Sequence, residues 1–282
     1  MSVIQEGSPY TLTVLGAGVI GQAFLSSYLA STNKPLNGPS KIIACVRSEA
    51  SAVSLKEQYK SSDVAFEVSY TTESNEAAVR EAAIIVIGLK PYLTEQVLNS
   101  IGSLDGKLLI SLVAGWTIEQ FKSYSSKISR VMTNTPAKYQ YGTAVVSNSP
   151  EVTDIERQLI SDLIGPIGKV IELPEKNMDA ATGLVGSGPA FVLLILEALM
   201  ESGLNLGIPL KESREAAIKV LEGTAKMVEL SGKHPGELKH QVCTPGGTTI
   251  AGIVEMESRG LKTAVIKGVE KAAQRASELG KK

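Results

Sequence analysis

The chain has 282 residues, of which 43% are hydrophobic and 20% are charged, and its formal net charge is −1. This length allows one large domain or two ordinary ones, each with an ample hydrophobic core. The near-neutral charge excludes the strongly basic surface that nucleic-acid binding requires, so we expect no nucleic-acid partner.

The cysteine content and the length of the apolar runs indicate the cellular compartment of the protein. Cys45 and Cys243 are too few for a disulfide framework, and their spacing matches no zinc-binding pattern. The N-terminal residues show no basic segment followed by a long apolar stretch. The longest apolar run, Phe191 to Leu196 and its neighbours, is shorter than the ~20 residues that span a bilayer. We therefore expect a cytoplasmic protein with no membrane association and no metal site.

The first half of the chain alternates between short apolar runs and helical patterns. Runs that predict strands occur at residues 11–16, 41–46, 66–68, 82–90, 107–115, 128–132, 142–147 and 168–173. Runs that are apolar on both faces and separated by helical segments indicate a parallel sheet covered by helices on each side.

The pattern changes at Leu173-Pro174-Glu175, after which helical periodicity dominates residues 192–207, 213–230 and 261–280. We expect an α/β protein with a Rossmann-type doubly wound sheet over residues 1–173 and an all-helical domain over residues 174–282. The helix at 192–207 is apolar nearly all round, which indicates burial on every side. Because so small a bundle cannot cover it, we expect a homodimer in which a second copy does so.

A glycine motif follows the first predicted strand and opens the first predicted helix. Gly16, Gly18 and Gly21 have the G-x-G-x-x-G spacing, with Val19 and Ile20 between the last two glycines. In this motif the glycines permit a tight turn, a close approach of backbone to a pyrophosphate and a close helix–strand contact. The free N–H groups at the helix N-terminus favour an anion. The context predicts dinucleotide binding, and the alternative is a purely structural turn.

The end of the second predicted strand bears on which dinucleotide binds. NAD-binding chains place an acidic residue there for the ribose hydroxyls, whereas this chain has Arg47 and Ser48. Both side chains offer donors to a 2′-phosphate, so we expect NADPH, with NADH as a possible substitute. The alternative is that Arg47 is a solvated loop residue.

Three further segments end predicted strands at the same edge of the sheet, where open α/β sheets bind ligands. They are Gly88 to Pro91, Val113 to Gly115, and Met132 to Pro136. Taken together they predict a floor for a nicotinamide, although each alone could be a strand-ending turn. Lys90 can reach phosphate, ribose or substrate, and Pro91 suits the first position of a helix.

The sequence has no pattern for metal or covalent catalysis. His234 and His240 pair with no nucleophile motif, and we expect them to be surface or loop residues. The chemistry is therefore expected to be hydride transfer from the cofactor, with the protein orienting the reactants.

Six segments together resemble the pyrroline-5-carboxylate reductase family, fungal members most closely. They are GAGVIG (16–21), VIGLKP (86–91), SLVAGW (111–116), MTNTPA (132–137), VGSGPAF (185–191) and HPGELKHQVCTPGGTTIAG (234–252). The resemblance covers essentially the whole chain. It implies NAD(P)H-dependent reduction of the cyclic imine Δ1-pyrroline-5-carboxylate to L-proline. It also implies a helical C-terminal domain that interlocks with its twin and, in some members, decamers of five dimers.

The motifs and the resemblance together define the expected site. The expected cofactor contacts are Gly16, Gly18, Val19, Ile20, Gly21, Arg47, Ser48, Asn75, Leu89, Lys90, Pro91, Val113 and Asn134. The expected substrate contacts are Val242, Gly246, Gly247, Thr248 and Thr249, with Thr249 and Lys90 as the catalytic residues. Ser231-Gly232-Lys233 has no acid where some members carry a glutamate near the substrate, so no carboxylate is assigned there.

The late loop CTPGGTTIAG (243–252) resembles the first glycine motif, because in both a glycine turn leads into a helix whose N–H groups can bind an anion. We expect the N–H groups of Gly247, Thr248 and Thr249 to bind the substrate carboxylate. The Thr249 hydroxyl would then hydrogen-bond the ring nitrogen and hold the imine carbon over the nicotinamide.

Two other functions fit the same general plan. A β-hydroxyacid-type dehydrogenase would need a lysine base on a C-terminal helix, and Lys219 or Lys226 would have to serve. A non-enzymatic NADP-sensing protein would use the late loop to contact a partner protein.

Overall fold

The structure, a computed structural model, describes residues 8–32 and 37–280. The first seven residues, part of the N-terminal stretch in which no targeting signal is expected, lie outside the described residues. The chain forms two compact units. The first comprises the residues up to Gly186 together with those from Ala272 onward, and the second comprises Ser187–Lys271.

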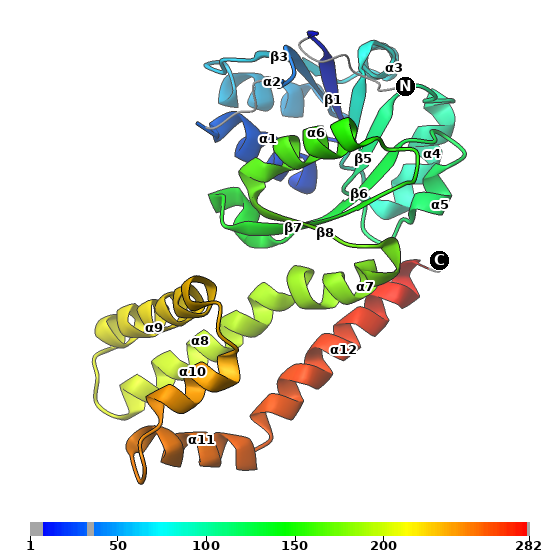
Figure 1. Ribbon diagram of the computed structural model, residues 1–282. Helices are drawn as coiled ribbons and strands as arrows, with labels where there is room; N and C mark the ends of the chain where they lie inside the picture. The colour runs from blue at the N-terminus through cyan, green and yellow to red at the C-terminus, as the bar shows by residue number, and fades with distance from the viewer. Residues whose placement is uncertain (1–7, 33–36, 281–282) are drawn as a thin grey trace. The chain divides into compact units, whose positions relative to one another are not determined.

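An eight-stranded sheet is the centre of the first unit, with the order β3-β2-β1-β4-β5-β6-β7-β8 (Figure 1). Each strand overlaps a run that the sequence predicts as a strand. The strands are β1 (Thr11–Leu15), β2 (Lys41–Cys45), β3 (Ala65–Ser69), β4 (Ile84–Ile87), β5 (Leu108–Ser111), β6 (Ile128–Met132), β7 (Gly142–Asn148) and β8 (Gly168–Glu172). The order of the first six is that of the doubly wound dinucleotide-binding fold, which confirms the predicted fold class.

One pair of strands differs from the expected parallel sheet. β7 runs antiparallel to β6, with Met132 opposite Val145, whereas the other neighbouring pairs are parallel. The connection between β6 and β7 contains only the short 3₁₀ segment η1 (Thr135–Tyr139). A parallel pair needs a crossover of about a dozen residues or more, so this connection is too short to return the chain to the starting edge.

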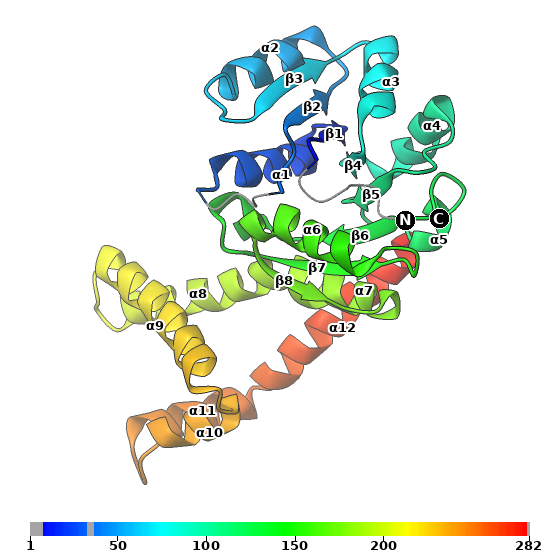
Figure 2. The ribbon, with the colours of Figure 1, turned by 45° about the horizontal axis from the view of Figure 1, so that its top comes forward.

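Helices cover both faces of the sheet, as predicted (Figure 1 and Figure 2). One hydrophobic cluster joins the sheet to α1, α2 and α6, and a second joins it to α3, α4 and α5. The helices are α1 (Val19–Ala30), α2 (Glu49–Gln58), α3 (Thr72–Glu81), α4 (Pro91–Ile101), α5 (Ile118–Phe121) and α6 (Asp154–Ile164), which is followed by η2 (Gly165–Ile167).

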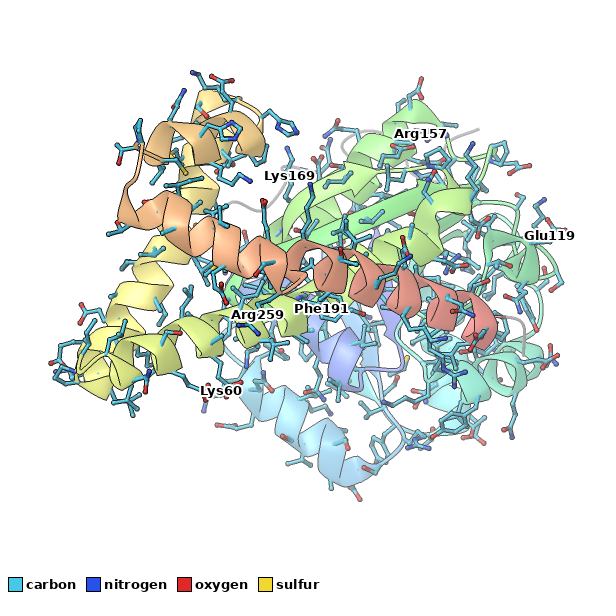
Figure 3. All side chains as sticks on the ribbon, turned by 90° about the horizontal axis from the view of Figure 1, so that it is seen from below. Lys60, Glu119, Arg157, Lys169, Phe191 and Arg259 are labelled. Carbon is cyan, nitrogen blue, oxygen red and sulfur yellow. The ribbon has the colours of Figure 1, made fainter. Side chains whose placement is uncertain are left out.

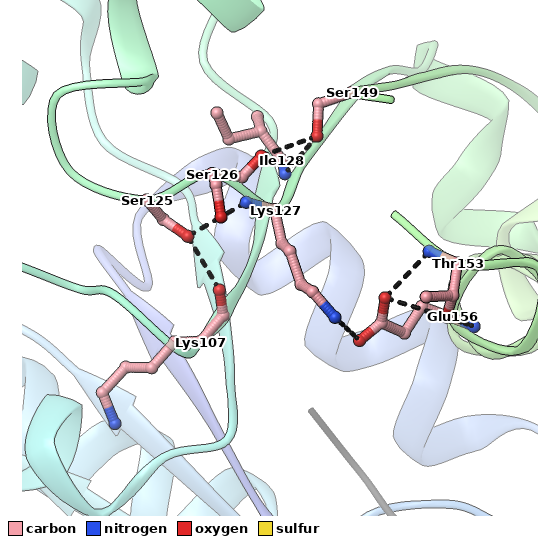
Figure 4. A network of polar contacts seen from close by, with 8 residues as sticks. All are labelled: Lys107, Ser125, Ser126, Lys127, Ile128, Ser149, Thr153 and Glu156. Carbon is pink, nitrogen blue, oxygen red and sulfur yellow. Dashed lines mark hydrogen bonds and ion pairs between the residues drawn. The ribbon is translucent and has the colours of Figure 1, made fainter. Parts of the chain in front are cut away.

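A buried ion pair ties β6 to the start of α6 (Figure 4). The Lys127 ammonium lies 2.6 Å from Glu156 Oε1, and the Glu156 side chain is fully buried. The other carboxylate oxygen accepts hydrogen bonds from the N–H and the hydroxyl of Thr153. Thr153 in turn caps α6, because its hydroxyl accepts from the Glu156 N–H. The reciprocal arrangement is a capping box whose buried carboxylate also pairs with the largely buried Lys127.

Residues 174–186 pack against the sheet, although the sequence analysis assigns them to the C-terminal domain. They form η3 (Glu175–Asn177), α7 (Met178–Ala181) and the π-helix η4 (Thr182–Gly186). Glu175 Oε1 accepts from the Ile118 N–H at 2.6 Å and pairs with the buried Arg130 at 3.4 Å. Through these polar contacts and the fully buried Met178, residues 174–186 belong to the compact unit that contains the sheet.

The second unit is helical, as predicted, and it contains one helix that the sequence analysis did not identify. Its helices are α8 (Gly188–Asn205), α9 (Leu210–Ser231), α10 (Pro235–Val242), α11 (Thr248–Ser258) and the first part of α12 (Leu261–Gly280). α10 occupies the polar stretch that contains both histidines. His234 is its N-cap, with Nδ1 accepting from the Gly236 N–H at 3.1 Å, whereas His240 lies within it.

The apolar residues of α8 are poorly covered within one chain. Phe191, labelled in Figure 3, is half-buried, whereas Leu193 and Leu194 are 61% and 66% exposed. No residue of α8 is buried within the described part of the chain. The all-round apolar character that the sequence shows is therefore not satisfied by the chain's own helices.

The helical stretch Glu175–Asn205 is long and apolar enough to cross a membrane by length and composition alone. The sequence analysis counted only uninterrupted apolar residues and so placed no such segment here. A single helix of this kind is weak evidence for a membrane span, because a core helix of a soluble protein passes the same test. The exposed Glu197 and Glu201 lie within it.

We predict that Glu156→Gln lowers the free energy of unfolding by about 3 kcal/mol, because it leaves Lys127 in a largely buried place without its counter-charge. Urea denaturation measures the change. Glu57→Gln is the matched control, since Glu57 pairs with Lys60 on the exposed surface of α2 and such pairs contribute about 0–1 kcal/mol. Equal losses in the two variants would contradict a stabilising role for the buried pair.

Candidate functional site

Three glycine backbones meet where β1 and β4 end. Gly16 has a φ of +89°, and a β-carbon there would lie 2.7 Å from Leu89 Cδ2. A β-carbon at Gly21 would lie 2.5 Å from the Gly16 carbonyl oxygen, and one at Gly88 would lie 2.7 Å from the same oxygen. The motif at 16–21 is therefore in direct contact with Gly88 and Leu89, as expected for residues at one edge of the sheet.

Gly18 differs from the glycines around it, because a β-carbon there would meet no atom within 4 Å. It is the N-cap of α1 and provides no side-chain cap, so the first N–H groups of α1 are open to an anion. Val19 and Ile20 are 79% and 40% exposed beside it. This open cradle fits the pyrophosphate of a dinucleotide, which needs backbone approach at the second glycine of the motif.

The end of β2 presents an exposed cation. No hydrogen bond or ion pair engages the Arg47 guanidinium among residues 8–32 and 37–280. Ser48 is the N-cap of α2, and its hydroxyl accepts from the Ser51 N–H at 3.3 Å. Asn75 is held beside this turn, with its amide nitrogen donating to the Val46 carbonyl at 3.1 Å and its oxygen accepting from Ser69 at 2.6 Å.

The residues after β4 and β5 lie at the same edge but differ in exposure. Lys90 is the N-cap of α4, with Pro91 as the first helical residue, and both are exposed. The Lys90 ammonium has no partner within the described part of the chain. Val113 is only 3% exposed and packs in the second hydrophobic cluster. Its side chain therefore contributes to the core, and its backbone is the part that faces the strand end.

Asn134, an expected cofactor contact, makes two structural hydrogen bonds. Its amide oxygen accepts from the Thr143 N–H at 3.0 Å, and its amide nitrogen donates to the Val185 carbonyl at 3.2 Å. It thereby joins the start of β7 to the π-helix η4. The neighbouring Thr133 hydroxyl is buried without a hydrogen-bond partner among the described residues.

The late glycine loop joins α10 to α11 in the helical unit. Gly246 has a φ of +67°, which favours glycine, and a β-carbon at Gly247 would lie 2.3 Å from Thr244 Oγ1. Gly247 is the N-cap of α11 and offers no side-chain cap, which leaves the N–H groups of Thr248 and Thr249 available. The expected carboxylate contact of the Gly247 N–H is wrong, because that group donates to the Thr244 carbonyl at 3.0 Å. Thr249 is half-buried and Thr248 is exposed.

The remaining expected residues are placed as follows. Val242, the last residue of α10, is 57% exposed and borders the loop. The alternative lysine bases on α9 do not suit that role, because Lys219 and Lys226 pair with Glu222 and Glu229 on the exposed surface. The hydrogen bond with Glu222 raises the pKa of Lys219, whereas a general base at neutral pH needs a lowered one.

No group of His, Cys, Asp or Glu that could hold a metal ion occurs in residues 8–32 and 37–280. Two surface hollows of the sheet unit, of about 480 and 620 Å³, contain none of the expected site residues. The expected cofactor residues instead line the open edge of the sheet at the ends of β1, β2 and β4.

One residue beside the expected site was not identified from the sequence. Ser69 ends β3 and holds Asn75. It stands at a strand end on the ligand-binding edge, so a rule that tested every strand end for polar residues would have found it.

We predict that Gly21→Ala and Gly18→Ala separate stability from dinucleotide binding. The Gly21 variant forces a backbone clash, so its melting temperature falls and binding falls with it. The Gly18 variant keeps its free energy of unfolding within about 1 kcal/mol of the parent. Its dinucleotide affinity falls about tenfold or more, because the methyl group occupies the space that the pyrophosphate needs. Calorimetric melting and titration measure the two quantities, and full affinity in Gly18→Ala would refute the cradle.

Two family models match separate parts of the chain. Residues 175–279 match the family model for pyrroline-5-carboxylate reductase dimerisation, and residues 11–115 match that for NADP oxidoreductase, coenzyme F420-dependent. A curated pyrroline-5-carboxylate reductase from Kluyveromyces lactis is 57% identical, and the alignment covers 98% of this chain and 99% of the relative.

Two solved structures extend the similarity to the fold. The pyrroline carboxylate reductase of Plasmodium falciparum, with NADP bound, is 27% identical with a TM-score of 0.79, covering 96% of this chain and 98% of that one. The pyrroline-5-carboxylate reductase of Coxiella burnetii is 26% identical with a TM-score of 0.83, covering 96% and 99%. The similarity extends over both units and confirms the resemblance in the sequence: the chain belongs to the pyrroline-5-carboxylate reductase family.

Proposed function

We infer that this chain catalyses the NAD(P)H-dependent reduction of Δ1-pyrroline-5-carboxylate to L-proline, the last step of proline synthesis. The observation that carries the inference is the 57% identity to a curated pyrroline-5-carboxylate reductase over nearly the whole of both chains. The match spans both the glycine cradle of the sheet unit and the late loop of the helical unit. The segment proposed to bind the cofactor and the segment proposed to bind the substrate are therefore both present.

The cofactor NAD(P)H supplies the hydride, and the sheet unit has the residues to hold it. The N-terminal N–H groups of α1 would hold the pyrophosphate beside Gly18, where a β-carbon would meet nothing. The exposed Val19 and Ile20 would contact the dinucleotide, as would Leu89, which lies next to Gly16. Lys90 and Pro91 lie at the end of β4, where the Lys90 ammonium would serve a phosphate, the ribose or the substrate.

We propose NADPH as the preferred form. Arg47 is an exposed guanidinium without a partner in the described part of the chain, and Ser48 adds a hydroxyl beside it. A guanidinium binds phosphate oxygens in a forked geometry, whereas NAD-binding chains place an acid for the ribose hydroxyls at the strand end where this chain has Arg47. Asn75 retains one amide hydrogen for the ribose, because its other contacts use only one.

The substrate is a planar ring with a carboxylate and a basic imine. The open N–H groups at the start of α11, those of Thr248 and Thr249, bind the carboxylate. The Gly247 N–H takes no part, because it donates to the Thr244 carbonyl. The proton that the imine takes up turns the ring carbon into a good hydride acceptor, so no strong enzyme acid is required. The resulting N–H donates to the Thr249 hydroxyl, which fixes the ring for transfer.

The assembly and the location are part of the proposal. The match of residues 175–279 to a dimerisation model supports a homodimer that covers the apolar residues of α8, and dimers could assemble into a decamer. Light scattering distinguishes these masses, and a monodisperse monomer would contradict the dimer. Cover of α8 by a second copy is also why we propose no membrane association. We propose a cytoplasmic location, supported by the two free cysteines and tested by cell fractionation.

We predict that the purified protein oxidises NADPH when Δ1-pyrroline-5-carboxylate is added, and that L-proline forms in equal amount. Absorbance at the nicotinamide band follows the reaction, and product analysis identifies proline. A 3-hydroxyacid with NADP, and NADPH alone, are the controls for the dehydrogenase and for a binding protein without activity. Turnover of the hydroxyacid only, or of nothing, would overturn the assignment.

We predict that Thr249→Val lowers kcat/KM about 10- to 100-fold, which is the value of one hydrogen bond to a charged group. The Kd for NADPH should stay near that of the parent, because Thr249 is assigned to the substrate. Thr249→Ser, which keeps the hydroxyl, should retain most of the activity. Unchanged kinetics in the valine variant would refute the role of the hydroxyl.

A further inference from the structure

The carboxyl end of β2 is hydrogen-bonded on both sides. The Cys45 carbonyl accepts from the Ala17 N–H at 2.9 Å, which joins it to the glycine motif. The Val46 N–H donates to the Ser69 carbonyl at 2.9 Å, which joins it to the end of β3. The backbone before Arg47 is therefore held between two neighbouring strand ends.

A chain of two side-chain hydrogen bonds, called the relay below, constrains this segment at a third point. The Ser69 hydroxyl donates to Asn75 Oδ1 at 2.6 Å, and Asn75 Nδ2 donates to the Val46 carbonyl at 3.1 Å. The Val46 carbonyl accepts only, so the nitrogen of the amide must face it and the oxygen must face Ser69. The Val46 carbonyl thereby fixes which way the Asn75 amide points, and the Ser69 hydroxyl holds the oxygen end of that amide in place.

Ser69 has one competing acceptor. Its hydroxyl also lies 3.3 Å from Cys45 Sγ. Burial raises the pKa of the Cys45 thiol to about 11, against a lowering from the Ser69 hydrogen bond, so the sulfur stays neutral at physiological pH. A neutral thiol is a weak acceptor, and the hydroxyl hydrogen therefore goes to Asn75.

Arg47 is the single residue between two held points. Val46 is fixed by the relay and by β3, and Ser48 is fixed as the N-cap of α2 through the Ser51 N–H. The guanidinium itself is exposed and has no partner among the residues that the structure describes. Its long side chain is thus anchored at the backbone only, and the direction in which it leaves that backbone depends on the turn.

We propose that Ser69 is a positioning residue for cofactor choice: through Asn75 and the Val46 carbonyl it holds the turn from which Arg47 reaches the 2′-phosphate of NADPH. The inference depends on the proposed role of Arg47. Loss of the Ser69 hydroxyl leaves the oxygen end of the Asn75 amide unheld, so its hydrogen bond to Val46 weakens and the turn samples other directions. The effect falls more strongly on NADPH than on NADH, because only NADPH carries the phosphate that Arg47 meets.

The test measures the Kd of NADPH and of NADH, together with kcat, for the full-length protein. Ser69→Ala should raise the Kd for NADPH about fivefold, the value of one hydrogen bond, and should change the Kd for NADH less than twofold. The kcat at saturating NADPH should stay at the parent value. Ser69→Thr keeps the hydroxyl and should keep the preference.

Two further variants make the result decisive. Ser129→Ala is the matched control, because Ser129 is a fully buried serine in β6 whose hydroxyl has no partner among the described residues. It should leave both dissociation constants unchanged. Arg47→Gln tests the underlying assignment and should weaken NADPH about tenfold or more, with NADH unaffected.

The outcomes separate the two ideas. If Arg47→Gln leaves the ratio of the Kd values for NADPH and NADH unchanged, the proposed role of Arg47 at the 2′-phosphate is wrong. The Ser69 inference, which depends on that role, is then wrong as well. If Arg47→Gln shifts the ratio but Ser69→Ala weakens both cofactors equally, or neither, Ser69 is structural only. If Ser69→Ala shifts the ratio and Ser129→Ala does not, the positioning role stands.

Discussion

The contact of three glycine backbones at the ends of β1 and β4 is the constraint on which the cofactor half of this protein depends. Gly16, Gly21 and Gly88 approach so closely that a methyl group at any of them would overlap a backbone or side-chain atom. This approach brings the first turn of α1 over the edge of the sheet and directs its free N–H groups outward. A β-carbon at Gly18 would meet no atom within 4 Å, so Gly18 is the glycine at which a ligand can approach the backbone.

The same physical device recurs in the helical unit at a smaller scale. Gly247 begins α11 without a side-chain cap, and the Thr244 hydroxyl occupies the place that a side chain there would need. An uncapped helix start is costly unless water or a ligand satisfies its N–H groups. One uncapped helix start suits a pyrophosphate and the other a single carboxylate, which matches the two molecules that the reaction brings together.

Much of this could be predicted from the sequence because the signals are local. The glycine spacing, the apolar strand runs and the turn at 246–247 are properties of neighbouring residues, and the structure has each of them in the expected element. The role of Asn134 shows the limit. Its type and position suggested a cofactor contact, but its amide joins β7 to η4, a pairing of residues 143 and 185 that no local pattern contains.

The sequence by itself determined the fold class, the family and the edge of the sheet at which the cofactor residues lie, since periodicity and motif spacing are fixed along the chain. Only the tertiary structure decided the antiparallel β7, the packing of residues 174–186 on the sheet and the relay from Ser69 to Val46. Those features depend on hydrogen bonds and ion pairs between residues of different strands, helices and turns. Such contacts exist only once the strands and helices have packed.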